Sequence, residues 1–224
     1  GGNGDYHVVV IAPGTVQELA DSTIKAFEIA DKYRVVVMIL GDGYLGQMAE
    51  PCVLPEEVKD LPVKPWALTG KTKDRDSHII ASLKLGGDDT KLNKHVKSLA
   101  ENYAEIAKNE VQYENFMCDD ADFVLCAYGT SARVCKKAVK ILREQGIKAG
   151  LFRPITLWPF PENELEAACA NAKKVLTVEM SLGQMVQDVR MYSGKKKADL
   201  DFYGEPGGVI PKLDVIVEKV KSYV

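Results

Sequence analysis

Largely apolar runs in the second half of the chain alternate with segments of helical periodicity. The runs extend from Phe123 to Tyr128, from Ala149 to Phe152 and from Lys174 to Glu179, and a further strand is predicted from Asp199 to Phe202. Strands that are apolar throughout and that alternate with helices are typical of a parallel sheet with right-handed crossovers. The pattern therefore predicts a self-contained α/β domain, closed by a helix from Leu213 to Tyr223.

The first fifty residues show a second α/β pattern. Strands predicted from His7 to Ala12 and from Val35 to Leu40 flank a helix, which Thr15 and Glu18 would begin as a capping box. Neither strand alternates between apolar and polar residues, so we expect both faces to be covered. One helix cannot do this alone. We therefore expect this region to be the end of a domain whose beginning is missing, and to pack against the second half of the chain or a second copy.

The segment between these two regions, from Glu50 to Asp89, is rich in proline, glycine and charged residues and is predicted to be a long connector. A helix follows, and its apolar spacing favours a single packing helix over a coiled coil. Its apolar positions are Leu92, Val96, Leu99, Tyr103, Ile106 and Tyr113. The predicted organisation is a first region at 1–48, a connector and packing helix at 49–114, and a domain at 115–224.

Composition narrows the class of protein. The contents of 46% hydrophobic and 27% charged residues are ordinary for a soluble globular protein, and the formal net charge of −3 argues against a nucleic-acid partner. No apolar run approaches the roughly 20 residues of a membrane span, and no signal peptide is recognisable. The basic run from Lys195 to Lys197 is expected to be a solvated turn. We expect a cytoplasmic protein that contacts no membrane.

The cysteines and histidines do not form a metal-ligand pattern. No C-x-x-C pair occurs, so neither a zinc ribbon nor an iron–sulfur cluster has a ligand set in this chain. The three histidines are scattered. The five cysteines are expected to be reduced and buried, and they are Cys52, Cys118, Cys126, Cys135 and Cys169.

The loop from Gly41 to Gln47 follows the second predicted strand. Ligands of open parallel sheets bind beyond the carboxyl ends of the strands, which makes Asp42, Gly43 and Gln47 the candidates for cofactor binding. The loop contains a literal G-x-G-x-x-G, but Pro51 would end any following helix after about one turn, so a dinucleotide site is not predicted. The glycines of the loop are expected instead to adopt positive φ.

The strand ends of the second half offer further polar candidates. The turn from Gly129 to Ser131, with Arg133 close behind, is either an anion site or, as we favour, an ordinary N-cap made by one of its hydroxyls. Arg153 and Glu179 end two predicted strands and would form a buried ion pair or contact another subunit. The aromatic residues between Leu157 and Pro161 would either contact a subunit or cap the local core.

Several segments together resemble one enzyme family. They are APGTVQE from Ala12, LGDGYLGQM from Leu40, E-x-x-Y-E-x-x-M from Glu110, YGTSAR from Tyr128, FRPITLWPFP from Phe152 and EMSLGQM from Glu179. The combination resembles the alpha subunit of thiamine-dependent 2-oxoacid:ferredoxin oxidoreductases of the ketoisovalerate or 2-oxoglutarate type. This resemblance implies a truncated pyrimidine-type thiamine-binding domain, followed by a transketolase C-terminal-like domain with a parallel sheet.

The resemblance also implies a function. Enzymes of this family oxidatively decarboxylate a 2-oxoacid to acyl-CoA and reduce ferredoxin, and a branched-chain substrate is favoured here. Beta, gamma and ferredoxin-like delta subunits are implied as partners, with thiamine diphosphate and magnesium in the full complex and iron–sulfur clusters on other subunits.

No residue of this chain matches the family's catalytic glutamate. We therefore predict no catalytic residue, no metal ligand and no cofactor bound to this chain alone. Two alternatives remain open: part of a 2-oxoacid dehydrogenase or transketolase, or a non-catalytic assembly or regulatory module with the same fold.

Overall fold

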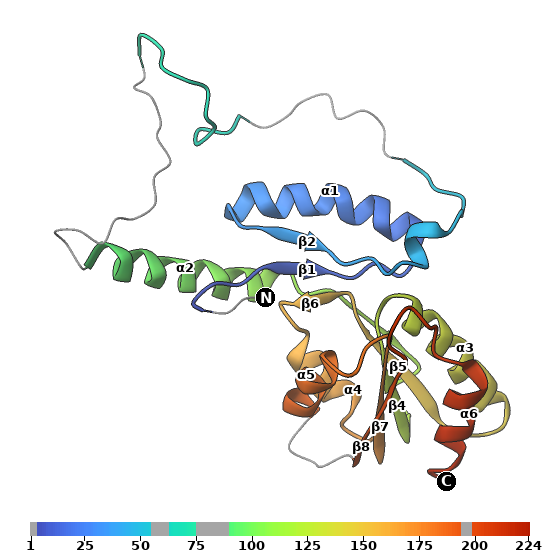
Figure 1. Cartoon of the computed structure of the whole chain (residues 1–224). Helices are drawn as coiled ribbons and strands as arrows, with labels where there is room; N and C mark the ends of the chain where they lie inside the picture. Colours follow the sequence, from blue (N-terminus) through green and yellow to red (C-terminus); the bar gives the residue numbers. More distant parts are fainter. Residues whose placement is uncertain (1–3, 55–62, 75–89, 194–198) are drawn as a thin grey trace.

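The computed structural model describes residues 4–54, 63–74, 90–193 and 199–224, which contain two β-sheets (Figure 1). The larger sheet has the strand order β3-β5-β4-β7-β8, and the smaller has the order β2-β1-β6. The chain is therefore an α/β protein, as its hydrophobic pattern predicts.

The larger sheet is built by the second half of the chain. Strands β4 (Phe123–Cys126), β5 (Ala149–Pro154), β7 (Lys174–Glu179) and β8 (Asp199–Gly204) run parallel. Only the edge strand β3 (Tyr113–Phe116) is antiparallel to its neighbour among the described strands of this sheet, and that neighbour is β5. The four predicted strands are confirmed.

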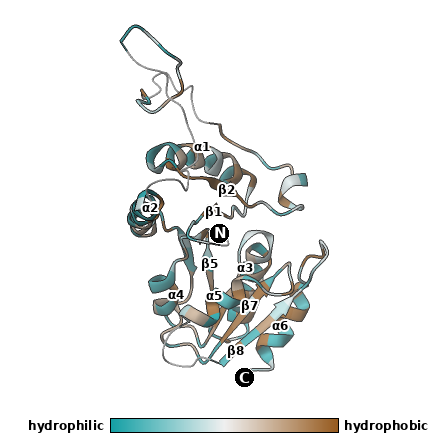
Figure 2. Cartoon of the chain, turned by 60° about the vertical axis from the view of Figure 1, so that its left-hand side comes forward, coloured by the Kyte–Doolittle hydropathy of each residue, from teal (hydrophilic) through white to brown (hydrophobic). Residues whose placement is uncertain are grey.

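Helices cover both faces of this sheet. Helices α3 (Gly129–Glu144) and α6 (Leu213–Lys221) pack on one face, while α4 (Glu162–Ala168) and α5 (Met185–Tyr192) pack on the other. Figure 2 shows hydrophobic residues, in brown, along the strands between these helices. Two apolar clusters, one on each face of the sheet, thus form the main core.

The smaller sheet joins the two halves of the chain. Strands β1 (Val9–Ile11) and β2 (Val37–Ile39) run parallel and are connected by helix α1 (Val16–Tyr33). The third strand, β6 (Thr156–Trp158), comes from the second half and pairs antiparallel with β1. The expectation that the N-terminal region packs against the second half of the chain is therefore confirmed.

The expectation that both β1 and β2 are covered on both faces is only half correct. Strand β1 lies in the middle of the sheet and is fully buried. Strand β2 is an edge strand with the burial pattern of a half-exposed strand, and Met38 at its centre is 47% exposed. Val36, just before it, is 68% exposed. An apolar strand sequence therefore does not show whether both faces of the strand are buried by the described residues.

Helix α2 (Thr90–Asn109) contacts the smaller sheet through Ile106 and Tyr103. It ends earlier than its apolar spacing predicts, because Tyr113 is the first residue of strand β3. The backbone N–H groups of Ile155 and Thr156 both donate to the carbonyl of Gln112, which draws this segment onto the end of β5. The pairing of β3 with β5 therefore determines where α2 ends, although the apolar spacing of the helix continues to Tyr113.

Candidate functional site

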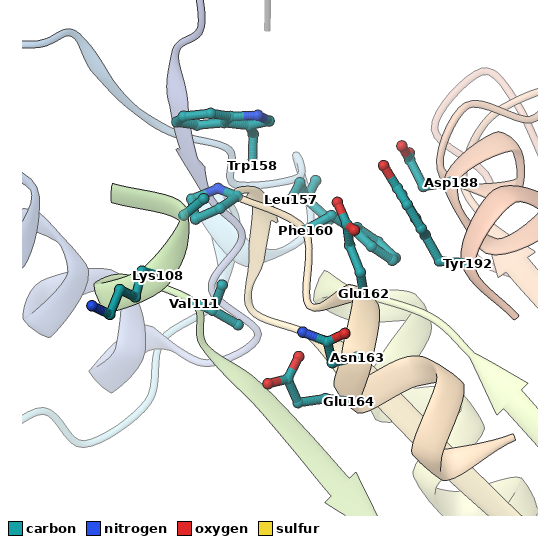
Figure 3. Close-up of a pocket in the computed structure, with 12 residues that line it drawn as sticks. Lys108, Val111, Leu157, Trp158, Phe160, Glu162, Asn163, Glu164, Asp188 and Tyr192 are labelled. Carbon is teal, nitrogen blue, oxygen red and sulfur yellow. The ribbon is translucent and has the colours of Figure 1, made fainter. Parts of the chain in front are cut away.

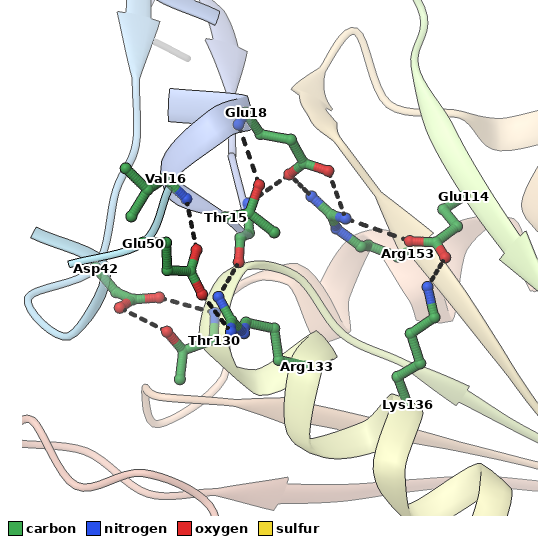
Figure 4. A network of polar contacts seen from close by, with 11 residues as sticks. Thr15, Val16, Glu18, Asp42, Glu50, Glu114, Thr130, Arg133, Lys136 and Arg153 are labelled. Atoms are coloured by element: carbon green, nitrogen blue, oxygen red, sulfur yellow. Dashed lines mark hydrogen bonds and ion pairs between the residues drawn. The ribbon is translucent and has the colours of Figure 1, made fainter. Parts of the chain in front are cut away.

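The loops after β1 and β2 meet the carboxyl ends of β4 and β5 in a polar junction (Figure 4). Asp42 reaches from the loop after β2 to the first turn of α3. Its Oδ1 accepts hydrogen bonds from Thr130 Oγ1 at 2.8 Å and from the Leu45 amide at 2.9 Å, and its Oδ2 accepts one from the Thr130 amide at 2.9 Å. A carboxylate there is favoured because the start of a helix carries unpaired N–H groups and a positive dipole end.

The prediction that a hydroxyl of the turn from Gly129 to Ser131 caps α3 is therefore wrong. The N-cap is Tyr128, and its side chain makes no capping hydrogen bond. The capping group is instead the Asp42 carboxylate. It fits because Gly129 has φ of 56°, and a Cβ at that position would lie 2.9 Å from Asp42 Oδ2. Glycine is required here both by backbone conformation and by space.

A second carboxylate of the same loop serves the start of α1. Arg133 Nη2 donates to Glu50 Oε1 at 2.7 Å, and Arg133 Nη1 donates to the Gly14 carbonyl at 3.2 Å. The other oxygen of Glu50 accepts a hydrogen bond from the Val16 amide at 3.1 Å. The hydrogen bonds from Arg133 and from Val16 hold the pKa of Glu50 below its ordinary value. The loop from Gly41 to Glu50 thus supplies one carboxylate to each of two helix starts.

Arg153 forms the other half of the junction. Its Nη1 donates to Glu18 Oε1 at 3.1 Å and to Glu114 Oε2 at 3.3 Å, and its Nη2 also pairs with Glu18. Glu114 pairs in turn with Lys136 of α3. The Arg153 side chain is only 8% exposed, and its Nε has no hydrogen-bond partner among the described residues. A Cβ on Gly14 would lie 2.9 Å from Arg153 Nη2, so glycine makes room for this side chain as well.

Glu18 also completes the start of α1. Its amide donates to Thr15 Oγ1 at 3.1 Å, as the predicted capping box requires. Its carboxylate accepts a hydrogen bond from the Gly14 amide at 2.7 Å. In a standard capping box the donor would be the amide of the N-cap residue, Thr15. Burial raises the pKa of Glu18, but hydrogen bonds from Arg153 and Gly14 outweigh it, so the pKa lies below the ordinary value.

The predicted ion pair between Arg153 and Glu179 is absent from the described residues. Glu179 is fully buried and points toward the start of α5. It accepts hydrogen bonds from Ser181 Oγ and from the amides of Gln184, Met185 and Val186. Three amides at a helix start satisfy a carboxylate without a cation, which leaves Arg153 to pair with Glu18 and Glu114. As predicted, the strands bring Arg153, Glu179 and Gly129 to one end of the sheet.

Sequence reasoning missed the roles of Glu50 and Glu114. In sequence, Glu50 opens the proline-rich connector, although it also lies at the end of the glycine-rich candidate loop. Glu114 belongs to the motif E-x-x-Y-E-x-x-M, which by itself indicates no partner for its carboxylate. The available signal is the presence of Arg133 directly after the buried first turn of α3, and of Arg153 within the fully buried strand β5. Such arginines need carboxylate partners, which pattern analysis cannot identify.

An apolar cleft adjoins the junction, between the smaller sheet and the start of α5. It consists of two cavities of about 380 and 260 Å³, which share Leu40, Tyr128 and Gln184 as lining residues. Asp188 lies in the larger cavity, and burial raises the pKa of its carboxyl group, with a further contribution from Glu179. Burial likewise raises the pKa of Tyr128. The cleft is apolar in character, and it contains no activated nucleophile among the described residues.

A third cavity, of about 440 Å³, lies between the end of α2 and helices α4 and α5 (Figure 3). Lys108 and Val111 lie on one side of it, and Asp188 and Tyr192 lie on the other. Burial and a hydrogen bond with Glu162 raise the pKa of Tyr192. The carboxylates of Glu162, Glu164 and Asp188 line this cavity.

The two aromatic residues of the proline-flanked segment pack within the chain. The Trp158 ring stacks on His7, with 4.6 Å between centroids, and meets Tyr103 edge-on at 5.7 Å. Phe160 is buried and stacks with Tyr192 at 5.7 Å. Of the two interpretations left open by the sequence, the structure supports core capping for these side chains.

The three residues predicted to bind a cofactor differ in their contacts and exposure. The Asp42 carboxylate is engaged within the chain, whereas Gly43 and Gln47 are exposed. Only a short 3₁₀ turn, η1 (Leu45–Gln47), follows the second glycine of the loop, which agrees with the rejection of a dinucleotide site. The expectation of positive φ at the glycines is wrong, because Gly41, Gly43 and Gly46 all lie outside that region. Cofactor binding by Asp42, Gly43 and Gln47 stays a prediction.

Four of the five cysteines are buried, and burial raises the thiol pKa of both Cys118 and Cys169 to about 12. Cys52 is exposed, contrary to expectation. It follows Pro51 outside both sheets. The described residues include no group of three or more histidine, cysteine or acidic side chains placed to hold a metal ion. Within the same residues, no helix combines the length and the apolar character that a membrane span requires.

Two family profiles match the chain one after the other. The family described as "Pyruvate flavodoxin/ferredoxin oxidoreductase, thiamine diP-bdg" matches residues 3–115, which are 113 of the 224 residues. The family described as "Pyruvate:ferredoxin oxidoreductase core domain II" matches residues 121–216. The two matches meet at strand β3 and the turn that follows it.

Curated proteins are similar over nearly the whole chain. The chain is 43% identical over 223 residues to ketoisovalerate oxidoreductase subunit VorB of Methanothermobacter thermautotrophicus, covering 99% of the chain and 62% of the relative. It is 32% identical over 250 residues to 2-oxoglutarate synthase subunit KorA of Methanothermobacter marburgensis, covering 98% of the chain and 65% of the relative. The chain therefore spans less than two thirds of the length of these relatives.

Solved structures share the fold. A 2-oxoglutarate:ferredoxin oxidoreductase from Magnetococcus marinus superposes with a TM-score of 0.77 at 21% identity, covering 99% of this chain and 43% of that one. A split gene transketolase superposes with a TM-score of 0.51 at 15% identity, covering 96% of this chain and 56% of that one. The fold expected from the sequence motifs is confirmed.

Proposed function

The chain belongs to the pyruvate flavodoxin/ferredoxin oxidoreductase family, and on that basis we propose that it is part of the alpha subunit of a 2-oxoacid:ferredoxin oxidoreductase. Such an enzyme would oxidise a 2-oxoacid to acyl-CoA and reduce ferredoxin. The observation that carries the proposal is the 43% identity over 223 residues to a ketoisovalerate oxidoreductase subunit, which extends across both family matches.

The preferred substrate is proposed to be a branched-chain 2-oxoacid. Identity to the two ketoisovalerate oxidoreductase subunits is 43%, whereas identity to the four 2-oxoglutarate synthase subunits is between 30% and 34%. A ketoisovalerate-type substrate is consistent with the larger value.

Thiamine diphosphate with magnesium is proposed as the cofactor of the complete enzyme, in which it would supply the decarboxylation chemistry. We expect the described residues not to form its site by themselves. A diphosphate with its metal requires oxygen ligands and N–H donors, and the described residues include no group of three or more histidine, cysteine or acidic side chains placed to hold a metal ion. Asp42 already fills the start of α3, and Glu50 and Glu18 are paired with Arg133 and Arg153.

The role proposed for this chain is structural. The junction fixes the loops of the thiamine-family half relative to the larger sheet, through carboxylates and arginines that belong to both halves. Beta, gamma and ferredoxin-like delta subunits are proposed as partners, with iron–sulfur clusters on those subunits and with ferredoxin and coenzyme A as co-substrates. A cytoplasmic location is proposed for the assembled enzyme.

The function is tested by purifying the complete protein from its source with its associated subunits. The complex should reduce a viologen dye in a reaction that requires both coenzyme A and a 2-oxoacid. We expect 2-ketoisovalerate to give the largest kcat/KM, and 2-oxoglutarate and pyruvate to give smaller values. Activity with none of the three acids would contradict the proposal, whereas preference for 2-oxoglutarate would contradict only the substrate.

A second measurement addresses the cofactor. Titration calorimetry of this chain alone with thiamine diphosphate and Mg²⁺ should give no micromolar binding, because the carboxylates of the junction are engaged within the chain. The intact complex provides the positive control. Micromolar binding to the chain alone would show that its described residues form more of the cofactor site than the junction contacts indicate.

A further inference from the structure

The larger sheet contains a topological switch point. Strand β4 comes first among its parallel strands in the chain, and β5 lies on one side of it while β7 lies on the other. Helix α3, which follows β4, and helix α4, which precedes β7, therefore cover opposite faces of the sheet. In open α/β sheets this arrangement leaves a crevice at the carboxyl ends of the two strands, and ligands bind in that crevice.

The smaller cavity of the apolar cleft lies in this crevice. Its volume is about 260 Å³, and its lining residues include Tyr128 and Ser131, which follow β4, and Ser181, which follows β7. It adjoins the cavity of about 380 Å³, because Leu40 and Gln184 also line both. The strand order and the cavities thus indicate the same place independently, and the space suits a small molecule.

The charge of the crevice is unusual for a switch point. Such crevices commonly bind anions, since the starts of helices point into them. Here carboxylates of the chain itself occupy both helix starts. Asp42 accepts the Thr130 amide at the start of α3 at 2.9 Å, and Glu179 accepts three amides at the start of α5. A phosphate or carboxylate ligand is therefore disfavoured, because its place at each helix start is already filled by a negative charge.

Two polar groups that line the larger cavity have no partner within the described part of the chain. The Tyr128 hydroxyl makes no hydrogen bond there, and no lysine, arginine or histidine of that part forms an ion pair with Asp188. Burial raises the pKa of the Asp188 carboxyl, and the charges of Glu179 and Glu162 add to this effect. A half-buried carboxylate among other acids, with no cation beside it, is unfavourable until a cation binds.

We propose that the cleft binds a small organic amine, whose ammonium group pairs with Asp188 and whose apolar body lies against Leu40, Tyr128 and Trp158. All four residues line the larger cavity. The two aromatic rings suit an alkylammonium group, because the face of an aromatic ring attracts a cation. An alcohol of the same shape would leave Asp188 without a cation, and an anion would be repelled by it. The proposal does not rest on the reaction proposed above.

The test compares three ligands that share an indole ring and differ in charge, namely tryptamine, tryptophol and indole-3-acetate. Calorimetry on the complete protein should give a Kd on the order of 0.1 mM for tryptamine, a value suited to a ligand of this size. Tryptophol should bind at least about tenfold more weakly, because it lacks the charged contact with Asp188. Indole-3-acetate should show no measurable binding.

Asp188→Asn is the deciding variant, since it keeps the shape of the side chain and removes its charge. It should weaken tryptamine binding about tenfold and leave the affinity for tryptophol unchanged. Its Tm should not fall, because a half-buried carboxylate without a cation does not stabilise the fold. Asp119→Asn is the matched control. Asp119 is exposed and precedes β4, at the opposite end of the strands, so this variant should change neither affinity.

A second variant tests the location. Leu40→Trp narrows both cavities at a side chain that is 39% exposed, so the fold should tolerate it while tryptamine and tryptophol both bind more weakly. Unchanged tryptamine affinity in this variant would overturn the proposal, since the amine would then bind elsewhere. Equal affinities for tryptamine and tryptophol, or binding of none of the three ligands, would overturn it too. So would an equal loss in Asp119→Asn and Asp188→Asn, which would indicate general attraction of cations to an acidic protein.

Discussion

The two sheets of the chain differ in how completely the chain covers them. In the larger sheet, helices lie on both faces, and every residue of β4 and β5 is buried. In the smaller sheet, only the central strand β1 is fully buried, and the edge strand β2 exposes Met38. Both regions have apolar strands in sequence. The difference shows that an apolar strand sequence predicts burial without indicating whether the described chain supplies the covering residues.

The smaller sheet also depends on the second half of the chain. Its third strand, β6, follows β5 directly, and the side chains of α2 that pack beneath it come from after the connector. The junction adds polar ties, from Asp42 to α3 and from Arg153 to Glu18. We therefore expect the N-terminal region to unfold with, or before, the larger sheet and never after it.

The largest expected effect contrasts the cores of the two regions. Leu151→Ala, at a fully buried position of β5, should lower the free energy of unfolding by about 3 to 4 kcal/mol because it leaves a cavity. Met38→Ala on the half-exposed strand β2 should lower it by less than about 1 kcal/mol. Urea unfolding monitored by circular dichroism measures both. Equal losses would show that β2 is as well packed in solution as β5, which would remove the contrast.

The next effect concerns the tie between the regions. Arg153→Ala leaves the carboxylates of Glu18 and Glu114 without their shared cation, and we expect a loss of about 2 to 3 kcal/mol, below the value for a fully buried pair because both acids are partly exposed. In the complete complex, the same variant should weaken assembly before it affects turnover.

The matched control for Arg153 is lysine. Arg153→Lys keeps the charge and loses the two-pronged contact with Glu18, so it should recover part of the lost stability. An Arg153→Ala complex that assembles normally but loses turnover by orders of magnitude would contradict the structural role. It would require Arg153 to act directly in the chemistry.

Sequence patterns predicted the larger sheet well because its central strands β4, β5 and β7 are largely apolar and buried and because its helices are strongly periodic. They missed β3 and β6, which are short and whose pairing is set by distant residues. Strand β3 continues the periodicity of α2, and β6 lies in a proline-rich segment. In both cases the deciding interaction is a backbone pairing with another strand, which no local pattern contains.

The sequence predicted where the polar residues of the candidate site lie better than it predicted which residues they contact. The strand-end rule predicted Gly129 and Arg153 at one end of the larger sheet, and it placed the loop at Asp42 beyond a strand of the N-terminal region. The structure brings the two places together. The partners were misassigned. A buried carboxylate such as Glu179 can accept hydrogen bonds either from an arginine or from amides at a helix start. Which of the two it contacts depends on the three-dimensional arrangement of the chain, which the sequence pattern does not give.

A smaller effect tests how the junction uses glycine. Gly129→Ala introduces both a strained φ and a methyl group 2.9 Å from Asp42 Oδ2, whereas Gly146→Ala introduces only a strained φ. We expect losses of about 2 kcal/mol for the first and about 1 kcal/mol for the second. The difference measures the contact between Asp42 and α3. Equal losses in thermal or urea unfolding would mean that this contact contributes little to stability.

The smallest effect is the pH dependence that Glu18 gives to the junction. Its pKa in the folded chain is below 4.5, since hydrogen bonds from Arg153 and the Gly14 amide outweigh the effect of burial. A carboxyl group with a lowered folded pKa stabilises the fold at pH values above its unfolded pKa, and that contribution is lost as the pH falls through the folded pKa. The free energy of unfolding should therefore decrease below about pH 4.5, and Glu18→Gln should flatten this decrease. Glu166→Gln, at an exposed position of α4, is the control and should leave the profile unchanged. An identical pH profile for Glu18→Gln and the parent would show that the tie between the two regions does not depend on the charge of Glu18.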